Sequence, residues 1–314
     1  MTISKNYYEQ DGWNLSTINE AAEKEPEQFV KRIECSFKAQ IEETADYVIK
    51  KQPECKILMI AGPSSSGKTT VANMIKAEFA KRNIWSTVIS LDDFYIGIDK
   101  LPILKNGSKD FESINGLDTF QIKQTLKSII YDGLCDMPIY DFSKMAPSNK
   151  RRHIKVPSNG MIIIEGLHAL NPIISDGLPI ESVLKIYVSV QNKVMFNGHE
   201  FISPEDIRLT RRVLRDYNYR DTMPIRTVMM WADVCRGEQL YIKPFEMESN
   251  ISINSFHAYE ICVMSKEMLG LMGSIPKNIQ EYEHIVKLTE KLREFKNINK
   301  SLVTSDSLIR EFIK

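Results

Sequence analysis

A glycine-rich turn that ends in a lysine and two threonines interrupts an apolar segment of this 314-residue chain. Residues 62–69 read GPSSSGKT and match the spacing G-x-x-x-x-G-K-S/T in full. Gly62 and Gly67 permit backbone angles that other residues resist, so successive N–H groups can point into one concavity at a helix N-terminus. Lys68 could then reach the β- and γ-phosphates, while the Thr69 hydroxyl could bind Mg²⁺. The turn is therefore predicted to cradle a nucleoside triphosphate.

The sequence around the turn supports this prediction over its alternative, a flexible Gly/Ser connector. An apolar, strand-like segment precedes the turn, and a helical pattern that includes Val71, Ile75 and Phe79 follows it, as the motif requires. The predicted nucleotide-binding residues of the turn are Gly62, Pro63, Ser64, Ser65, Ser66, Gly67, Lys68, Thr69 and Thr70.

Three carboxylates stand at the ends of predicted strands. Asp92 and Asp93 occur in SLDDFY, and Glu165 occurs in IIIEG. A kinase needs a carboxylate that orients and deprotonates the attacking hydroxyl, and a second that holds the metal. A single acid in such a place would more simply cap a helix or end a strand. Three of them near a phosphate-binding turn favour a functional site.

Four arginines fall within an arc of about 100° on one predicted helix, in the segment IRLTRRVLRDYNYR. Such a cationic face suits a triphosphate and the charge that develops in a transition state. Arg220, just beyond, is predicted to belong to a lid that closes over the site. The alternative is a salt-bridged surface helix in which Glu205 and Asp206 pair with some of the arginines. The four residues are Arg208, Arg211, Arg212 and Arg215.

The elements that must position these groups alternate between strand and helix. Strands are predicted at residues 56–62, 86–93, 161–166 and 183–190, with a fifth at 251–255. Helices are predicted between most of them, at 118–131 and 206–219 among others. The alternation predicts an α/β fold of the P-loop NTPase type, a mostly parallel sheet flanked by helices, with a helical lid. In such sheets ligands bind beyond the carboxyl ends of the strands, where the three acids fall.

Three further parts of the chain complete the predicted organisation. Residues 1–52 are predicted to form a helical N-terminal extension, with apolar side chains every four residues from Phe29 to Ala45. Residues 53–314 are predicted to form the kinase domain. Within it, strands near 138–142 and 152–157 should form a β-hairpin whose turn contains Pro147, Ser148 and Asn149. Residues 277–314 are predicted to contain one or two helices.

The composition restricts the class of partner. Lys plus Arg (41) equals Asp plus Glu (41), so no overall field draws the chain to nucleic acid or to an anionic membrane. The five cysteines contain no C-x-x-C pair, which favours buried thiols in a reducing compartment. No segment approaches the apolar length of a membrane span. We therefore expect a cytoplasmic protein with a small-molecule substrate and neither nucleic acid nor membrane as a partner, while a homo-oligomer stays open.

Taken together, these segments resemble the uridine kinase and phosphoribulokinase family of P-loop kinases. The matching pieces, in order, are GPSSSGKTT, SLDDFY, DFESINGLDTF, MPIYDF, IIIEGLHALNP and RLTRRVLRD. A bacterial branch of this family is similar in two further segments, the one from YNYRDTMPIRTVMMW to IKPF and the terminal SLIREFI. In that branch a uridine-kinase-like domain follows a TGS and threonyl-tRNA-synthetase-like region, and in this sequence the helical extension stands in that place.

The resemblance implies roles for individual residues. Asp92 would be the base toward the 5′-hydroxyl of a ribose, and Arg215 would join it and Lys68 in catalysis. Arg212 and Arg220 would bind the nucleotide. The implied metal-binding residues are Thr69, Glu165 and Asp92. The predicted substrate-binding residues are Asp93, Tyr95, Glu112, Tyr140, Phe142 and His168, of which His168 could equally cap the following turn.

Two positions depart from the family's pattern. Uridine-cytidine kinases have a histidine soon after P-x-Y-D-F that reads the pyrimidine edge, whereas this chain has SKMAPSNK, with Met145 near that place. A second arginine that usually follows the one at Arg220 is replaced near Thr222. These differences bear on the identity of the acceptor and hardly on the fold or the phosphoryl transfer.

The sequence therefore favours an ATP- and Mg²⁺-dependent kinase of a small-molecule hydroxyl, with the 5′-hydroxyl of a nucleoside such as uridine or cytidine as the favoured acceptor. One alternative is the same chemistry on a sugar phosphate or another polyol. An alternative of a different class is an ATP-binding regulatory switch without an acceptor. The insertion of MPIYDF between a helix and the third strand favours an acceptor pocket over a switch.

Overall fold

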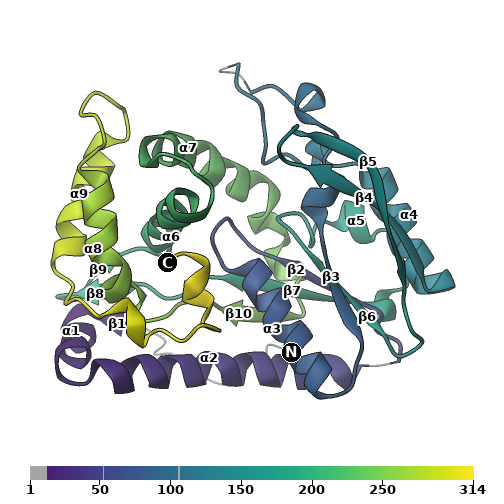
Figure 1. Ribbon diagram of the computed structural model, residues 1–314, viewed down its shortest axis with the longest axis horizontal. Helices are drawn as coiled ribbons and strands as arrows, with labels where there is room; N and C mark the ends of the chain where they lie inside the picture. Colours follow the sequence, from purple (N-terminus) through teal and green to yellow (C-terminus); the bar gives the residue numbers. More distant parts are fainter. Residues whose placement is uncertain (1–12, 52, 105–106) are drawn as a thin grey trace.

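A five-stranded parallel sheet forms the centre of the protein, and its strands lie where the sequence predicts them. The computed structural model describes residues 13–51, 53–104 and 107–314 (Figure 1). The strand order is β10-β7-β2-β6-β3, and each neighbouring pair is parallel. This confirms the predicted α/β class. The strands are β2 (Ile57–Ala61), β3 (Ser86–Ser90), β6 (Met161–Glu165), β7 (Val183–Ser189) and β10 (Ile251–Asn254).

Helices cover both faces of this sheet, which explains why its strands β2 and β6 are buried along their whole length. In β2, Leu58 and Ile60 pack into one apolar cluster with side chains of α2 (Pro26–Ile49), α3 (Lys68–Lys81), α6 (Pro204–Tyr219) and α8 (Glu260–Met272). The alternate residues Ile57 and Met59 pack into a second cluster with α4 (Thr119–Asp132). The period of two along β2 thus divides the core into two layers.

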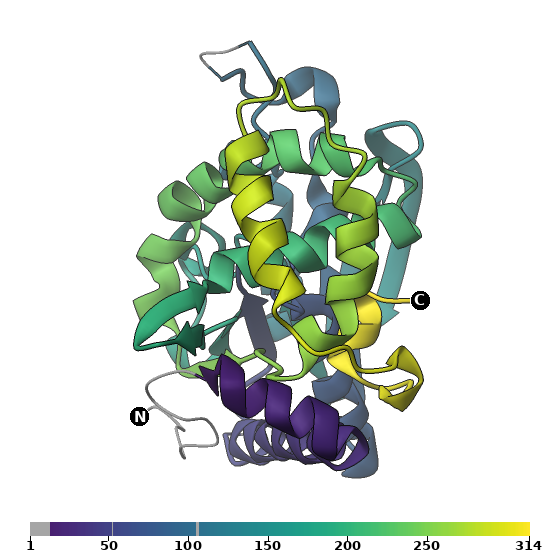
Figure 2. The same cartoon turned by 90° about the vertical axis from the view of Figure 1, so that its left-hand side faces the viewer.

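The remaining helices lie around this core. Figure 2 shows α8 and α9 side by side at one end of the molecule, with α1 below them. The other α-helices are α1 (Leu15–Lys24), α5 (Pro172–Ser175), α7 (Pro224–Tyr241) and α9 (Tyr282–Arg293). The 3₁₀-helices are η1 (Leu91–Phe94), η2 (Ile98–Lys100), η3 (Ile114–Gly116), η4 (Ile180–Ser182), η5 (Lys243–Glu248), η6 (Lys300–Leu302) and η7 (Leu308–Glu311).

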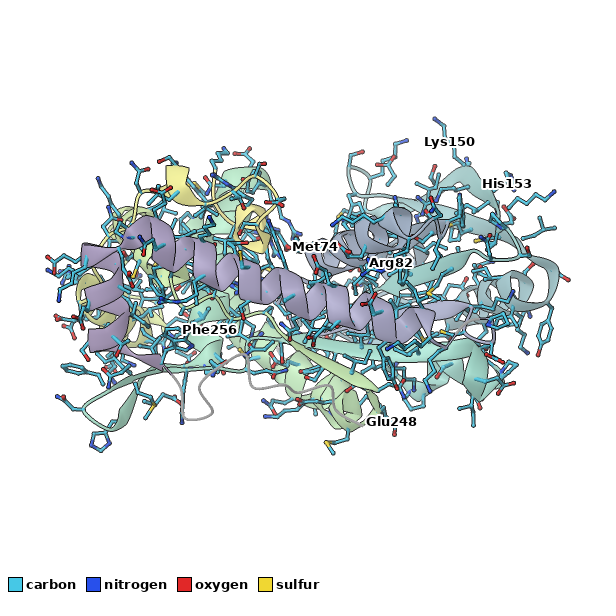
Figure 3. The ribbon with its side chains drawn as sticks, turned by 90° about the horizontal axis from the view of Figure 1, so that it is seen from below. Met74, Arg82, Lys150, His153, Glu248 and Phe256 are labelled. Atoms are coloured by element: carbon cyan, nitrogen blue, oxygen red, sulfur yellow. The ribbon has the colours of Figure 1, made fainter. Side chains whose placement is uncertain are left out.

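The N-terminal helix α2 shares the core with the sheet. The five apolar residues spaced by four along it are all buried, and Figure 3 shows the helix running across the underside of the molecule. Arg82, at the end of α3, donates a hydrogen bond to Asp46 of α2 at 2.8 Å. The division of the chain at residue 52 stays a prediction, since α2 and β2 belong to one apolar cluster.

Two boundaries differ from the prediction. The second strand ends at Ser90, because the Ser90 side chain accepts a hydrogen bond from the Asp92 N–H and turns the chain into η1, which carries both acids. The predicted hairpin turn at residues 147–149 is wrong. Pro147 instead lies in β5 (Ala146–Lys155) opposite Tyr140 of β4 (Leu134–Asp141). The chain reverses at residues 142–145, a turn that ends with Met145, whose φ is 52°. A two-stranded hairpin consists of edge strands, where proline is tolerated.

The sequence analysis missed a second, small sheet. It contains β1 (Trp13–Asn14), β8 (Val194–Phe196) and β9 (His199–Ile202), in that order. Asn197 and Gly198, which join β8 to β9, have φ angles of 51° and 78°, and this pair is a strong sequence signal for a hairpin. Among the residues that the structure describes, no helix is long and apolar enough to cross a membrane.

The C-terminal part contains α9, as predicted, followed by the short helices η6 and η7 rather than a second α-helix. After α9 the chain turns back across the molecule. In Figure 1 this last segment, drawn in yellow, lies between α2 and α6 and beside α3. The end of the chain thus packs next to the glycine-rich turn.

Candidate active site

The glycine-rich turn connects β2 to α3, and its two glycines are required by its neighbours. A Cβ atom on Gly62 would lie 1.9 Å from the backbone oxygen of Val188, and one on Gly67 would lie 2.6 Å from Leu308. Gly67 also has a φ of 89°, in the left-handed region that glycine adopts without strain. Because α3 begins at Lys68, the turn presents the unpaired N–H groups of a helix N-terminus, which favour an anion.

A cavity lies against this turn, beyond the carboxyl ends of β2, β3 and β6. Four acidic and four basic side chains face each other in its wall, so it is strongly polar. The lining residues are Ser64, Ser65, Gly67, Lys68, Thr69, Asp92, Tyr95, Phe111, Glu112, Glu165, Gly166, Leu167, Arg212, Arg215, Arg220 and Glu311.

Lys68, Thr69 and Glu165 meet at the base of this cavity. The Thr69 hydroxyl donates a hydrogen bond to Glu165 Oε2 at 3.2 Å, and Lys68 Nζ donates to the Pro63 oxygen at 3.0 Å. Burial lowers the pKa of Lys68, and the carboxylates of Glu165 and Glu311 act against this decrease. The glycine-rich turn, Lys68 and Glu165 at the end of β6 are therefore linked by hydrogen bonds and by the interaction of their charges.

Asp92 and Glu112 are the two acids in the cavity with raised pKa values. Burial and the nearby carboxylate of Glu165 raise the pKa of Asp92 to about 6, against the opposing charge of Lys68. Burial raises the pKa of Glu112 to about 7, while Arg212 and Lys68 act to lower it. A carboxylate with a pKa near the working pH suits a group that accepts a proton during a reaction.

The predicted arginine strip divides into two groups. Arg211 is fully buried and donates two hydrogen bonds to Glu260, at 2.6 and 3.0 Å, and one to the Ser65 oxygen at 3.2 Å. Arg208 pairs with Glu238 at 2.7 Å and donates to the Ser64 oxygen at 3.2 Å. These two arginines hold the backbone of the turn from behind, whereas Arg212, Arg215 and Arg220 line the cavity.

The three cavity arginines share one acidic partner, Asp216, which the sequence analysis did not single out. Its side chain is buried and lies 2.9 Å from Arg215, 3.5 Å from Arg212 and 3.6 Å from Arg220. The Thr227 hydroxyl donates to it at 3.3 Å. Asp216 thus offsets the mutual repulsion of three like charges and keeps them together at the cavity wall.

The predicted substrate-binding residues occupy different places. Tyr95 and Glu112 line the cavity. Glu112 Oε2 is buried, with no hydrogen-bond partner among the described residues. Helix α7 packs against Glu112 closely, since a Cβ atom on Gly237 would lie 2.2 Å from Glu112 Cβ. Glu112 is therefore held in place by its packing against α7.

Asp93 of η1 and the hairpin residues Tyr140 and Phe142 lie outside the cavity lining. Asp93 accepts a hydrogen bond from the Tyr140 N–H at 3.3 Å and pairs with Arg152 at 3.3 Å. The Tyr140 ring lies 5.9 Å from the Tyr95 ring and 5.0 Å from the exposed Phe142 ring. Asp93 thus joins the hairpin to η1, and Tyr140 supports Tyr95.

His168 also lies behind the cavity wall. It is buried, and its ring centre is 6.2 Å from that of Tyr241. Burial lowers the pKa of His168 to about 4, so the ring is neutral at neutral pH. A neutral ring packed against an aromatic neighbour supports the wall and adds no charge to it.

The residues present fit a magnesium ion that is bound together with a phosphate chain. Thr69, Glu165 and Asp92 offer oxygen ligands only, as Mg²⁺ prefers. Among the described residues, no group of three or more His, Cys, Asp and Glu side chains could hold a metal by itself. Mg²⁺ is usually bound through one or two carboxylates, waters and substrate phosphates.

Replacement of Arg211 by alanine should destabilise the protein strongly. The Glu260 carboxylate would stay fully buried without its partner, so the free energy of unfolding should fall by about 3–5 kcal/mol. Urea unfolding followed by circular dichroism measures the change. Arg32→Ala is a matched control, because Arg32 pairs with Glu25 in an exposed position and should contribute about 1 kcal/mol at most. Equal losses for both variants would contradict the structural role of Arg211.

Comparison with known proteins adds a family match. The sequence model described as the phosphoribulokinase / uridine kinase family matches residues 57–262. A uridine kinase of Clostridium botulinum (strain Kyoto / Type A2) is 29% identical over 199 residues, which cover 63% of this chain and 86% of that protein. A uridine kinase of Ureaplasma parvum is 27% identical over 198 residues, with the same coverage.

Among solved structures, the D-glycerate 3-kinase of Cryptococcus neoformans var. grubii aligns with a TM-score of 0.48 and 14% identity, over 66% of this chain and 89% of that one.

Proposed function

Because the chain belongs to the phosphoribulokinase and uridine kinase family, we propose that it transfers the γ-phosphoryl group of ATP to a small-molecule hydroxyl, with the 5′-hydroxyl of a nucleoside such as uridine or cytidine as the favoured acceptor. The observation that carries the proposal is the shared cavity. Lys68 at the phosphate-binding turn and Asp92 after the neighbouring strand β3 line the same cavity. A phosphate held by Lys68 would therefore lie in the cavity that Asp92 also lines.

The donor side of the cavity would bind the phosphate chain of ATP. The N-terminus of α3 and Lys68 would hold the β- and γ-phosphates, and Arg212, Arg215 and Arg220 would neutralise charge on the transferred group. Magnesium, held by Thr69 and Glu165 together with phosphate oxygens, would supply further charge neutralisation. In the proposed mechanism, Asp216 keeps the three arginines at the wall before the donor arrives.

The acceptor side would position the attacking hydroxyl. In this proposal Asp92 accepts a hydrogen bond from the hydroxyl, orients it toward the γ-phosphorus and takes its proton as the new O–P bond forms. The bond between the γ-phosphorus and the bridging oxygen of ATP breaks, and ADP leaves. Glu112, with a buried oxygen that lacks a hydrogen-bond partner among the described residues, would accept hydrogen bonds from further hydroxyl groups of the acceptor.

A non-nucleoside acceptor, such as a sugar phosphate or another polyol, is the second candidate. The placement of Tyr140 and Phe142 outside the cavity lining favours it, because these rings were expected to pack on a nucleobase. In either case we propose a cytoplasmic enzyme, in keeping with its five free cysteines.

ATP turnover with and without a panel of acceptors tests the proposal. Uridine or cytidine should stimulate release of ADP, and mass spectrometry should find the nucleoside 5′-monophosphate. Stimulation by sugar phosphates or polyols alone would instead support the second candidate. If no compound in the panel raises turnover above the slow background hydrolysis, a nucleotide-dependent switch becomes the better description.

The proposed general base predicts a loss of activity in mild acid. Asp92, with a pKa raised to about 6, is increasingly protonated below that pH and then cannot accept the proton of the acceptor. The value of kcat/KM for the acceptor should therefore be constant above about pH 7 and approach a tenfold decrease per pH unit below about pH 6. A profile measured from pH 5 to 8.5 with saturating ATP tests this. A flat profile would contradict the role of Asp92.

A further inference from the structure

The C-terminal segment, residues 299–314, forms part of the wall of the phosphate-binding cavity. Leu308 packs against Gly67, where a Cβ atom on the glycine would lie 2.6 Å from it. The Thr70 hydroxyl donates a hydrogen bond to Glu311 Oε2 at 2.6 Å, across 241 residues of chain. Glu311 also lines the cavity. A carboxylate from the end of the chain is thus placed among the groups that are proposed to bind the donor.

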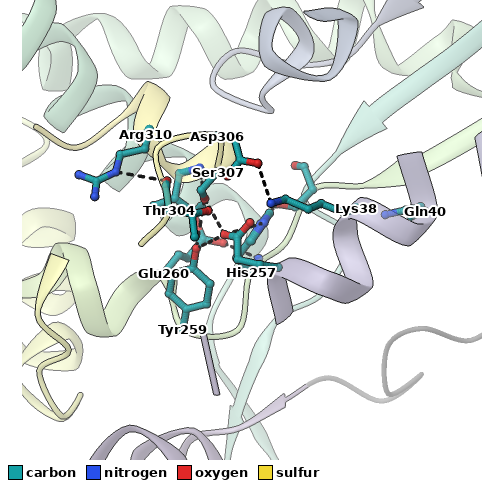
Figure 4. Close-up of polar contacts among 12 residues, drawn as sticks. Lys38, Gln40, His257, Tyr259, Glu260, Thr304, Asp306, Ser307 and Arg310 are labelled. Atoms are coloured by element: carbon teal, nitrogen blue, oxygen red, sulfur yellow. Dashed lines mark hydrogen bonds and ion pairs between the residues drawn. The ribbon is translucent and has the colours of Figure 1, made fainter. Parts of the chain in front are cut away.

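Several contacts hold this segment in place. Lys38 of α2 pairs with Asp306 at 2.7 Å (Figure 4). The Ser307 hydroxyl donates to Glu34 Oε1 at 2.6 Å. On its other side, the Tyr219 hydroxyl donates to the Ile313 oxygen at 2.5 Å. Because α2 and α6 both hold the segment, the position of Glu311 is well determined.

The bond between Thr70 and Glu311 uses a group that a phosphate would also require. Thr70 is the third residue of α3, in the first helical turn, where this type of motif binds phosphate oxygens. A threonine hydroxyl has one proton, and here it is donated to the carboxylate. A phosphate at the same turn would compete for that proton, and the two anions would repel each other at short distance.

The charges around Glu311 support the same view. Burial lowers the pKa of both Lys68 and Arg220, and the Glu311 carboxylate opposes this decrease in each case. Glu311 is one of four acidic side chains that line the cavity together with Lys68, Arg212, Arg215 and Arg220. Glu311 thus adds a negative charge to the cavity wall beside the glycine-rich turn, where it is bonded to Thr70.

We propose that Glu311 is a donor-site residue that competes with the phosphate chain of the nucleotide for Thr70, so that the C-terminal segment sets the affinity for the donor. This inference rests on the proposed function, because it takes the ligand of the turn to be a nucleoside di- or triphosphate. When the nucleotide binds, the Glu311 side chain turns away and the Thr70 hydroxyl donates to the phosphate instead.

The test is the affinity of the full chain for ADP and ATP, measured by isothermal titration calorimetry with Mg²⁺ and without an acceptor. Glu311→Gln removes the negative charge but keeps the shape, and a glutamine amide can donate to a phosphate oxygen. We expect both nucleotides to bind about tenfold more tightly to this variant. In a Thr70→Val background the gain should shrink to less than about threefold, because the two residues act through one contact.

Asp306→Asn is the matched control. Asp306 lies in the same segment and loses one exposed ion pair, but it does not line the cavity. Nucleotide affinity should stay within about twofold of the unchanged protein. A gain in nucleotide affinity equal to that of Glu311→Gln would show that loosening the segment is enough to tighten binding. It would overturn the specific role of Glu311.

The other outcomes separate this inference from the proposed function. The unchanged protein and the Glu311→Gln variant could both bind ADP, with equal or weaker affinity in the variant. The proposed competition between Glu311 and phosphate would then be wrong, while the kinase proposal would stand. If neither protein binds ADP or ATP, the proposed function fails and this inference fails with it. Thermal unfolding of each variant shows that it is folded before affinities are compared.

Discussion

Replacement of Asp92 by asparagine should lower acceptor-dependent ATP turnover by about 10² or more while leaving ATP affinity nearly unchanged. Asparagine keeps the shape and can still accept a hydrogen bond, but it cannot take the proton of the attacking hydroxyl. The pKa of Asp92, raised to about 6, leaves the carboxylate mostly ionised at neutral pH and still basic enough for this role. The loss should therefore appear in kcat and not in the dissociation constant of ATP.

Steady-state kinetics with the best acceptor of the panel and a separate ATP titration measure these two quantities. Asp93, the adjacent residue, provides a matched control. Asp93 has the same side chain but binds the Tyr140 N–H and Arg152 outside the cavity lining, so Asp93→Asn should lower turnover less than about tenfold. Undiminished turnover in Asp92→Asn would remove Asp92 from the mechanism.

Replacement of Lys68 by methionine should lower turnover by about 10³, and it should weaken nucleotide binding as well. Methionine has a similar length but no charge, so the phosphates would lose a cation held within a cavity of restricted solvent access. This distinguishes Lys68 from Asp92, since the lysine is proposed to contact the donor both before and during the transfer.

The kinetic constants at saturating acceptor, together with ADP titrations, measure both effects of the Lys68 variant. Lys76→Met is the matched control, because Lys76 lies in the same helix α3 with its side chain exposed. It should change neither constant by more than about twofold. Normal ADP affinity and turnover in Lys68→Met would contradict the assignment of the turn as the phosphate site.

Much of the fold could be predicted from the sequence because its signals are local. An apolar strand, a glycine turn and an amphipathic helix follow one another within residues 57–81, and each is recognised from its neighbours along the chain. The five strands of the main sheet lie where predicted for the same reason. The hairpin turn was misplaced because Pro147, Ser148 and Asn149 favour turns by composition, whereas pairing of β4 with β5 decided where the chain reverses.

The candidate site could be predicted in part. Its residues at strand ends, Asp92 and Glu165, fall together because parallel strands place their carboxyl ends at one edge of the sheet. Helical spacing put the arginines on one face, but it could not distinguish those that support the turn from those that line the cavity. That distinction depends on Glu238 and Glu260, which belong to other helices and pair with Arg208 and Arg211.

The sequence by itself determined the phosphate-binding turn, the order of the strands along the chain and the acids that follow them, because each depends on residues close together in the chain. Only the tertiary structure decided which arginines face the cavity, through the pairing of Arg208 with Glu238 and of Arg211 with Glu260, and that Glu311 reaches Thr70 across 241 residues. These contacts join elements distant in sequence. They follow from the packing of α2, α6 and α8 around the sheet, which no local pattern encodes.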